Sequence, residues 1–243
     1  MGTSYNSNIV TDGLVLCLDA ANPRSYPLSG NTWYDLSGNG YNGTLQNGPT
    51  FSSANRGAMS FDGTNDYVSF ADTTIGSFNN ATLSYGAWFY FDGTSQEGII
   101  VAKRNDNPYN QYSMAISNHP SNGGSGTNFN AFANTDQNQG GYMMFSYSLS
   151  STGAGWYYGF IVINNNNQTM FVNGKPVRFL TQAYSGKTFN MTNKPLYVGA
   201  TNLNNSPAVF FDNKISIVYL YNRALSASEV LQNYNATRGR YGY

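Results

Sequence analysis

Side chains able to act as acids, bases or nucleophiles are scarce in this 243-residue sequence. It contains two glutamates, Glu97 and Glu229, and a single histidine, His119. Hydrolysis of a glycosidic bond usually needs two carboxylates that flank the bond, and on a strand these would occupy alternate positions facing one way. Glu97 falls in a loop-like stretch and Glu229 in a helix-capping position. The sequence therefore offers no such pair, and it does not predict an enzyme.

The remaining reactive groups fit structural roles. Cys17 lies in the apolar run 14–18, which predicts a buried strand residue, and as a lone cysteine it excludes an intrachain disulfide. His119 lies in a long stretch rich in Asn, Gly and Ser, which predicts an exposed loop position. The sequence has no Gly-x-Ser-x-Gly motif, no glycine-rich phosphate loop and no Cys/His cluster for zinc.

One segment has the spacing of a calcium-binding loop. Oxygen-bearing side chains occur at Asp35, Ser37 and Asn39, a glycine follows, and the Tyr41 carbonyl comes next. This order matches the first half of an EF-hand loop, which has ligands at positions 1, 3, 5 and 7 and glycine at 6. Position 12 is Gln46 instead of Glu, so the alternative is a turn held by side-chain-to-backbone hydrogen bonds. Calcium is the one cofactor that the sequence suggests.

A second segment has the residue types of a sugar-binding loop. Asp106, Asn107, Tyr109 and Asn110 stand close together after an apolar run. An aromatic ring can cover the apolar face of a sugar, while amides and carboxylates bond its hydroxyls. The alternative is that a chain rich in Asn and Tyr places such groups everywhere.

The composition excludes several classes of protein. Twelve basic residues balance twelve acidic ones, and only 10% of residues are charged. A neutral chain lacks the basic stripe that a nucleic-acid or anionic-membrane partner requires. Aromatic residues make up 16% of the chain, which argues against disorder, and no apolar run is long enough to span a membrane. Its polarity comes from 34 Asn and 44 Ser and Thr.

Strand signals dominate the sequence. In 82–91, Leu83, Tyr85, Ala87, Phe89 and Phe91 alternate with other residues, which predicts a strand with one core-facing side. Asn and Gly at 173–174 separate two apolar runs, a strong signal for a hairpin with a type I′ turn. Roughly a dozen strands with this spacing predict an all-β sandwich.

One helix is predicted, near the C-terminus. Ser226 with Glu229 forms a capping box, and Leu225 with Val230 forms a hydrophobic staple. The helix should run to about residue 235. We expect Val230, Tyr234 and Leu231 to pack on the sheets.

An ordered set of short motifs resembles a known family. The motifs occupy 12–26, 33–45, 60–68, 85–89, 170–177, 196–200 and 215–226. Together they are similar to a laminin G-like domain of the concanavalin A-like lectin/glucanase superfamily, and in particular to single-domain versions in tailed, including marine, bacteriophages. The resemblance covers roughly residues 12 to 240. It implies a jelly-roll sandwich of two antiparallel sheets with one short C-terminal helix.

This resemblance favours a non-enzymatic virion component, such as a capsid decoration, tail-fibre or appendage protein that binds host-surface glycans. No disulfide and no visible secretion signal, together with an extracellular-type surface, fit a particle assembled in the host cytoplasm and released later. The alternative is a free, extracellular lectin-like module with calcium-assisted sugar recognition. Partners would be other virion proteins and host glycans, with no nucleic acid and no membrane.

The predicted organisation is an N-terminal arm (1–11), one jelly-roll domain (12–235) and a C-terminal tail (236–243). Both ends fall outside the strand pattern, so they are candidates for docking arms. Arg238, Arg240, Tyr241 and Tyr243 in the tail suit an interface, where Arg and Tyr are enriched. A homo-oligomer is compatible with these features. The alternative for both ends is simple fraying.

Overall fold

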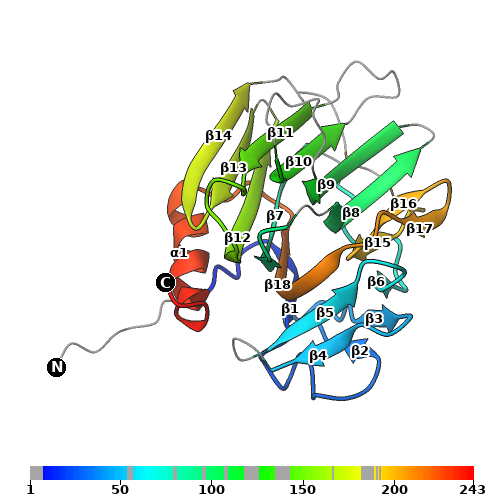
Figure 1. The fold of residues 1–243 in the computed structure, drawn as a ribbon. Helices are drawn as coiled ribbons and strands as arrows, with labels where there is room; N and C mark the ends of the chain where they lie inside the picture. Colours follow the sequence, from blue (N-terminus) through cyan, green and yellow to red (C-terminus); the bar gives the residue numbers. More distant parts are fainter. Residues whose placement is uncertain are drawn as a thin grey trace.

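The computed structural model describes residues 8–53, 57–78, 81–94, 97–106, 109–117, 126–134, 143–165, 167–181, 189, 191 and 193–243 (Figure 1). They form a sandwich of two large antiparallel sheets with one short helix near the C-terminus, which confirms the predicted jelly roll. The described residues contain eighteen strands rather than about a dozen. The sequence pattern missed several strands because they have only two to five residues, too few to show alternation.

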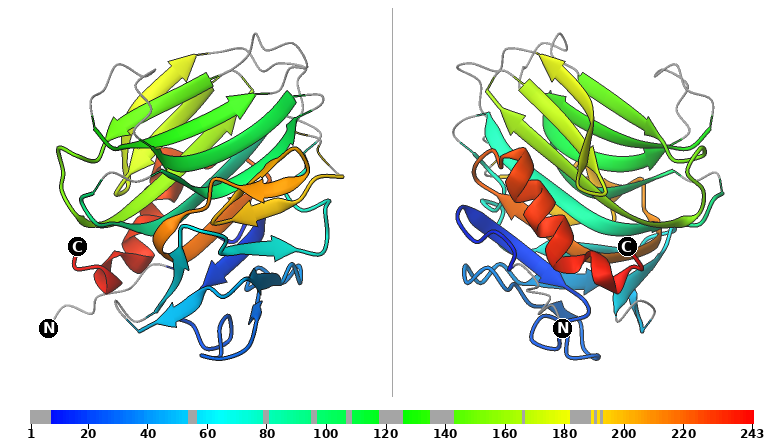
Figure 2. Two further views of the ribbon diagram at one scale, coloured as in Figure 1. Left: turned by 45° about the vertical axis from the view of Figure 1, so that its right-hand side comes forward. Right: turned by 90° about the vertical axis from the view of Figure 1, so that its left-hand side faces the viewer.

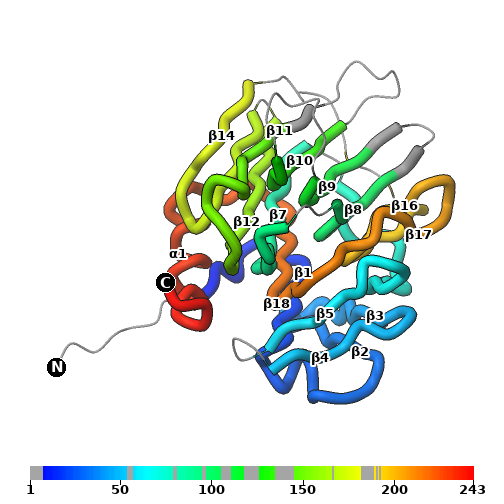
Figure 3. Tube along the Cα trace, viewed as in Figure 1, coloured from blue at the N-terminus to red at the C-terminus, as the bar shows by residue number. Residues whose placement is uncertain are grey.

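Sheet A has the strand order β14-β13-β12-β7-β18-β5-β4, and β1 also pairs with β18. Its strands are β1 (Leu14–Asp19), β4 (Thr50–Ser52), β5 (Ala58–Asp62), β7 (Thr82–Phe91), β12 (Gly155–Asn164), β13 (Asn167–Val172), β14 (Lys175–Thr181) and β18 (Asp212–Tyr221). Figure 3 shows the orange β18 beside the blue β1 and the cyan β5. On its other side β18 pairs with β7, so it joins the two halves of the sheet.

Sheet B has the strand order β11-β10-β9-β8-β15-β6-β3-β2. Its strands are β2 (Thr32–Trp33), β3 (Gly43–Gln46), β6 (Tyr67–Phe70), β8 (Gly98–Asp106), β9 (Tyr109–Ser117), β10 (Asn128–Asn134), β11 (Met143–Ser148) and β15 (Leu196–Val198). A small separate hairpin consists of β16 (Thr201–Leu203) and β17 (Ser206–Ala208). The two views in Figure 2 show the sheets as layers, with the helix along the outside of sheet A.

Strand β7 shows why sheet A is apolar on both faces. The alternating set from Leu83 to Phe91 is buried in the core between the two sheets, as predicted. The residue between two of these, Trp88, is equally buried but belongs to a second core on the outer face. That second core contains Val230 and Tyr234 of the helix. The strand therefore needs apolar side chains on both sides.

The helix α1 (Ala227–Thr237) begins with the predicted capping box and continues into a 3-10 turn, η3 (Arg238–Arg240). Ser226 accepts a bond from the Glu229 N–H, while the Glu229 carboxylate accepts one from the Ser226 N–H at 2.8 Å. The helix ends two residues later than expected. The prediction that Leu231 packs on the sheets is wrong, because its side chain is 43% exposed.

The predicted hairpin turn connects β13 and β14. Asn173 and Gly174 both have positive φ, 50° and 75°, as a type I′ turn requires. A side chain at Gly174 would meet the ring of Tyr234, so the turn also lets α1 approach the sheet. In the described part of the chain, no helix is long and apolar enough to cross a membrane.

Candidate functional site

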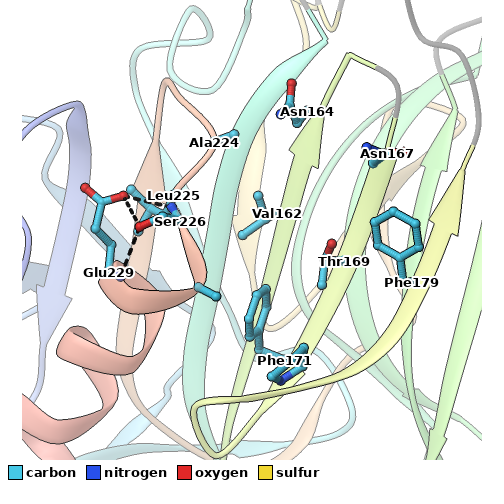
Figure 4. Close-up of a pocket in the computed structure, with 12 residues that line it drawn as sticks. Val162, Asn164, Asn167, Thr169, Phe171, Phe179, Ala224, Leu225, Ser226 and Glu229 are labelled. Carbon is cyan, nitrogen blue, oxygen red and sulfur yellow. Dashed lines mark hydrogen bonds between the residues drawn. The ribbon is translucent and has the colours of Figure 1, made fainter.

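A groove with a volume of about 500 Å³ lies on the outer face of sheet A (Figure 4). Strands β12, β13 and β14 form its floor and one side. The loop that leads into α1, with the first residues of the helix, forms the other side. The described residues that line it are Val162, Asn164, Asn167, Thr169, Phe171, Pro176, Phe179, Ala224, Leu225, Ser226, Ala227 and Glu229.

Strand register arranges the floor of the groove in rows. Val162 pairs with Thr169, and Thr169 pairs with Phe179, so these three side chains form one row across the strands. Asn164 pairs with Asn167 in a parallel row at the β12–β13 turn. Because side chains directly opposite each other in an antiparallel pair share a face, each row presents its groups to the same side.

The wall of the groove is fixed by a buried serine in β7. The Ser84 hydroxyl donates to the Arg223 carbonyl at 2.8 Å and accepts from the Leu225 N–H at 2.9 Å. Ser84 is fully buried, so these two bonds fix the position of the loop before α1 relative to the sheet. Leu225 then fills the base of the wall, since its side chain is only 4% exposed.

The groove combines one open aromatic ring with neutral polar groups. The Phe179 side chain is 62% exposed, so its ring is open to a ligand. Within the described part of the chain, the side chains of Asn164, Asn167 and Thr169 carry no hydrogen bond, so their polar atoms are open to a ligand. Figure 4 shows Phe179 on the far strand from the helix and Asn164 and Asn167 at one end of the groove.

Glu229 is the charged residue at the rim of the groove. Its two carboxylate oxygens accept from Arg223 at 2.6 and 3.1 Å, in a bidentate pair. This guanidinium, assisted by bonds from Ser226, lowers the pKa of Glu229 to about 2. The carboxylate is therefore ionised at any working pH, which makes it a fixed negative charge instead of a proton donor.

The loop predicted to bind calcium is stabilised by its own hydrogen bonds. The Asp35 carboxylate accepts from the N–H groups of Cys17 (3.0 Å), Ser37 (2.9 Å) and Tyr41 (3.2 Å), and from the Ser37 hydroxyl (2.6 Å). Asn39 directs its NH₂ group, a donor, to the carbonyls of residues 14 and 15. A cation would have to displace these donors, so the folded loop fits the turn interpretation and does not fit calcium.

Two further aspartates lie in the β5–β6 turn, and their carboxylates bond within that turn. Asp62 accepts from the Thr64 and Asn65 N–H groups, and these bonds lower its pKa. Asp66 accepts from the Asp62 N–H at 3.2 Å, and burial raises its pKa. No group of three or more His, Cys, Asp or Glu side chains that could hold a metal occurs in the described residues.

The loop predicted to bind sugar is the tip of the β8–β9 hairpin. Asp106 ends β8 and pairs with Tyr109 at the start of β9, and Asn110 follows in that strand. Asn107 lies outside the described residues, as do the side chains of the other three. Sugar binding by this hairpin stays a prediction. The described residues that line the groove on sheet A come from other parts of the chain.

The C-terminal tail packs on its own domain. Tyr241 is 7% exposed and stacks on Trp88 with ring centres 3.8 Å apart. Arg240 forms an ion pair with Asp19 at 2.7 Å, and the Tyr243 hydroxyl donates to the Trp156 carbonyl at 2.6 Å. These contacts correct the expectation that the tail is a separate docking arm, because Arg240, Tyr241 and Tyr243 contact residues of their own domain.

Arg238 lies over the Tyr234 ring of α1, 5.9 Å from its centre. Tyr243 is the most accessible of the tail tyrosines, at 46% exposed. Contact of these residues with a partner stays a prediction.

Part of the expected N-terminal arm is also attached to the domain. The Val10 N–H donates to Asn233 at 2.8 Å, and the Val10 carbonyl accepts from Tyr221 at 2.9 Å. Residues 8–11 therefore join the outer core of sheet A, and residues 1–7 lie outside the described residues.

The reactive residues have the structural roles expected where they are described. Cys17 is buried in β1, and burial raises the pKa of its thiol. Glu97 is exposed just before β8, far in sequence from Glu229 in α1. His119 lies outside the described residues.

The sequence pattern did not identify the groove residues as a site. The run of four asparagines at 164–167 was visible as a break between two strands. The alternation after this run could have indicated the site. Asn167, Thr169 and Phe171 lie on one face of β13, and Phe179 of β14 pairs with Thr169 and lies on the same face. If β13 and β14 are treated as one surface, the hairpin pattern places these four side chains on a common face.

A laminin G-type family model, described as the concanavalin A-like lectin/glucanases superfamily, matches residues 62–231. No similar sequence is found among curated proteins.

Similar solved structures include the ligand-binding domain of botulinum neurotoxin serotype D in complex with N-acetylneuraminic acid, with a TM-score of 0.67 and 12% identity. The match covers 93% of this chain and 51% of that one. The binding domain of botulinum neurotoxin DC in complex with rat synaptotagmin II has a TM-score of 0.67 and 15% identity, with coverage of 94% and 52%.

The binding domain of Paraclostridial Mosquitocidal Protein 1 has a TM-score of 0.67 and 16% identity, with coverage of 93% and 52%. This chain thus spans about half the length of these structures. At such identities the likeness concerns the fold alone. The family match covers more than half of the sequence, and the chain belongs to the concanavalin A-like lectin/glucanases superfamily.

Proposed function

We propose that this chain is a non-enzymatic carbohydrate-binding adhesion domain, and that the groove between β12–β14 and α1 holds a sugar ring. The observation that carries the proposal is the placement of the exposed Phe179 ring in one groove with the open side chains of Asn164, Asn167 and Thr169. A sugar has an apolar C–H face and a rim of hydroxyls, so it needs both kinds of group within a few ångströms.

Binding, rather than turnover, suits the chemistry of the groove. Its neutral amides and hydroxyl can donate to and accept from sugar hydroxyls, but they are poor general acids and bases. Glu229 is the single carboxylate among the described lining residues, and it is bonded to Arg223. Cleavage of a glycosidic bond usually requires a second carboxylate on the other side of that bond.

The comparisons support binding of an external partner in general terms. Neighbours in fold include domains in complex with N-acetylneuraminic acid and with rat synaptotagmin II, a sugar and a protein. The superfamily description itself includes lectins. We therefore favour a glycan-binding role over a purely structural one.

We further propose that the domain acts on a phage virion, where it attaches to other virion proteins and meets host-surface glycans. Support comes from the motif resemblance and from the neutral, Asn- and Tyr-rich composition, which suits adaptable polar contacts. The test is copurification with intact particles through a density gradient, followed by imaging. Stoichiometric copurification is expected, and absence from every particle fraction would overturn the virion role without affecting the sugar site.

The sugar site is tested by glycan-array screening and then by titration of Phe179→Ala against the best glycan. Covering about 50 Å² of apolar surface contributes about 1.3 kcal/mol, so the variant should lose about tenfold in affinity. Leu180→Ala is the matched control, because Leu180 is exposed on the same strand but does not line the groove. Equal affinity of both variants and the wild type would refute this site.

A further inference from the structure

The charged groups around the groove are already paired within the chain. Arg223 directs two guanidinium nitrogens to the Glu229 carboxylate, at 2.6 and 3.1 Å. Its third nitrogen, Nε, lies 2.8 Å from the Asp12 carboxylate and donates to the Asp12 carbonyl at 3.0 Å. One cation thus faces two anions, and no positive charge of Arg223 is left for a ligand.

The partial positive charge at the start of α1 is also balanced by a group of the chain itself. The first N–H groups of a helix carry partial positive charge and attract anions. Here the Glu229 carboxylate already accepts from the Ser226 N–H at 2.8 Å and from its hydroxyl at 2.9 Å. An acidic ligand arriving at this end of the groove would therefore meet a built-in anion.

The basic residues of β14 face away from the groove. Arg178 pairs with Met170, and Lys175 pairs with Val172. Met170 and Val172 are buried in the core between the two sheets, so their partners also lie on that side of β14. In agreement, the Arg178 Nε donates to the Ser146 carbonyl of sheet B at 3.0 Å.

We propose that the groove selects neutral glycans and discriminates against glycans that end in an acidic sugar. This inference rests on the proposed sugar site and specifies its ligand class. Every described lining residue is uncharged except Glu229. Glu229, its partner Arg223 and Asp12 together carry a net charge of −1, which repels a carboxylated sugar. Two like unit charges about 7 Å apart in a solvated groove repel enough to weaken binding about threefold.

The test is titration with two glycans that share one neutral core, one of them carrying a terminal sialic acid, at physiological salt. The neutral glycan should bind the wild type about threefold more tightly. Glu229→Gln should reduce this ratio towards one, because it removes the repelling charge and releases Arg223. Glutamine also keeps the capping box, so the helix start is retained.

Asp12→Asn is the matched control. It removes the other negative partner of Arg223. Because the Asp12 side chain is 85% exposed and does not line the groove, water screens its charge, and the ratio should fall less than in Glu229→Gln. Equal or tighter binding of the sialylated glycan by the wild type would overturn the inference and leave the sugar site standing. An unchanged ratio in Glu229→Gln would also overturn it. Absence of binding to any glycan would instead overturn the proposed function.

Discussion

Lys103 is a buried lysine whose titration should appear directly in the stability of the domain. Its side chain has no exposed surface, and its Nζ donates to the carbonyls of Thr73 at 2.8 Å and Lys194 at 2.6 Å. A neutral amine has two N–H groups, which match these two acceptors. An ammonium has a third N–H and a charge, and both are costly to bury.

Burial lowers the pKa of Lys103 to about 7, with a small opposing effect from Asp72. In the unfolded chain a lysine titrates near pH 10.4. Between these values the unfolded state binds one proton more than the folded state, so stability must rise with pH. With half of the folded amines protonated at pH 7, integration of this proton difference from pH 7 to 8.5 gives a rise of about 1.6 kcal/mol in the free energy of unfolding from Lys103. Cysteine ionises near pH 8.5 in an unfolded chain, while burial raises the pKa of Cys17 in the folded one, so this thiol lowers the stability by about 0.4 kcal/mol at pH 8.5. Tyrosine ionises above the window.

Urea unfolding of the wild type and of Lys103→Met at pH 7, 7.5, 8 and 8.5 measures this rise. The wild-type free energy of unfolding should increase by about 1.2 kcal/mol across the window, and that of the variant should fall by about 0.4 kcal/mol, so that the two differ by the contribution of Lys103. Lys194→Met is the control, since that partly exposed side chain bonds Asn205 at the surface and should keep the wild-type slope. A flat wild-type curve, or a variant curve parallel to it, would refute the reasoning.

Three further changes test packing, backbone and metal. Tyr241→Ala removes a buried ring stacked on Trp88, and we expect a loss of about 3 kcal/mol in urea unfolding; a loss below about 1 kcal/mol would mean that the tail is not docked. Gly86→Ala places a Cβ against the ring of Phe160 and should cost about 3 kcal/mol, whereas Gly155→Ala, with open space around it, should be near neutral by the same assay. Calcium should leave the melting temperature unchanged, because donors within the loop already surround the Asp35 carboxylate, while Asp35→Asn should lower it; a rise with calcium would instead confirm the metal prediction.

Features encoded by adjacent residues were predictable from the sequence. The turn at Asn173 and Gly174 and the capping box at Ser226 and Glu229 formed as expected, because each depends on the chemistry of two to four neighbouring residues. The inward face of β7 was predicted equally well, since its alternation extends over ten residues. Two-sided burial of sheet A also explains why two of the residues between the inward set, Trp88 and Tyr90, are aromatic.

Features that depend on distant residues were not predictable. The groove wall is held by Ser84, which is 139 residues from the Arg223 carbonyl to which it donates. Leu231 was expected to be buried because its helical position is near the apolar stripe, but α1 turns it outwards beside the hairpin turn. The docked tail was also unexpected, because no local pattern shows that Tyr241 has a partner at Trp88.

The position of β18 in sheet A has a consequence for how the domain is made. The strands β1 and β5 on one side and β7 on the other all pair with β18, although they precede it by well over a hundred residues. During synthesis on the ribosome, both halves of the sheet emerge before the strand that joins them. Such non-local pairing folds slowly, on a scale of milliseconds to seconds, and leaves open strand edges until it is complete. We therefore expect the nascent chain to depend on chaperones until β18 has left the ribosome and the sheet can close.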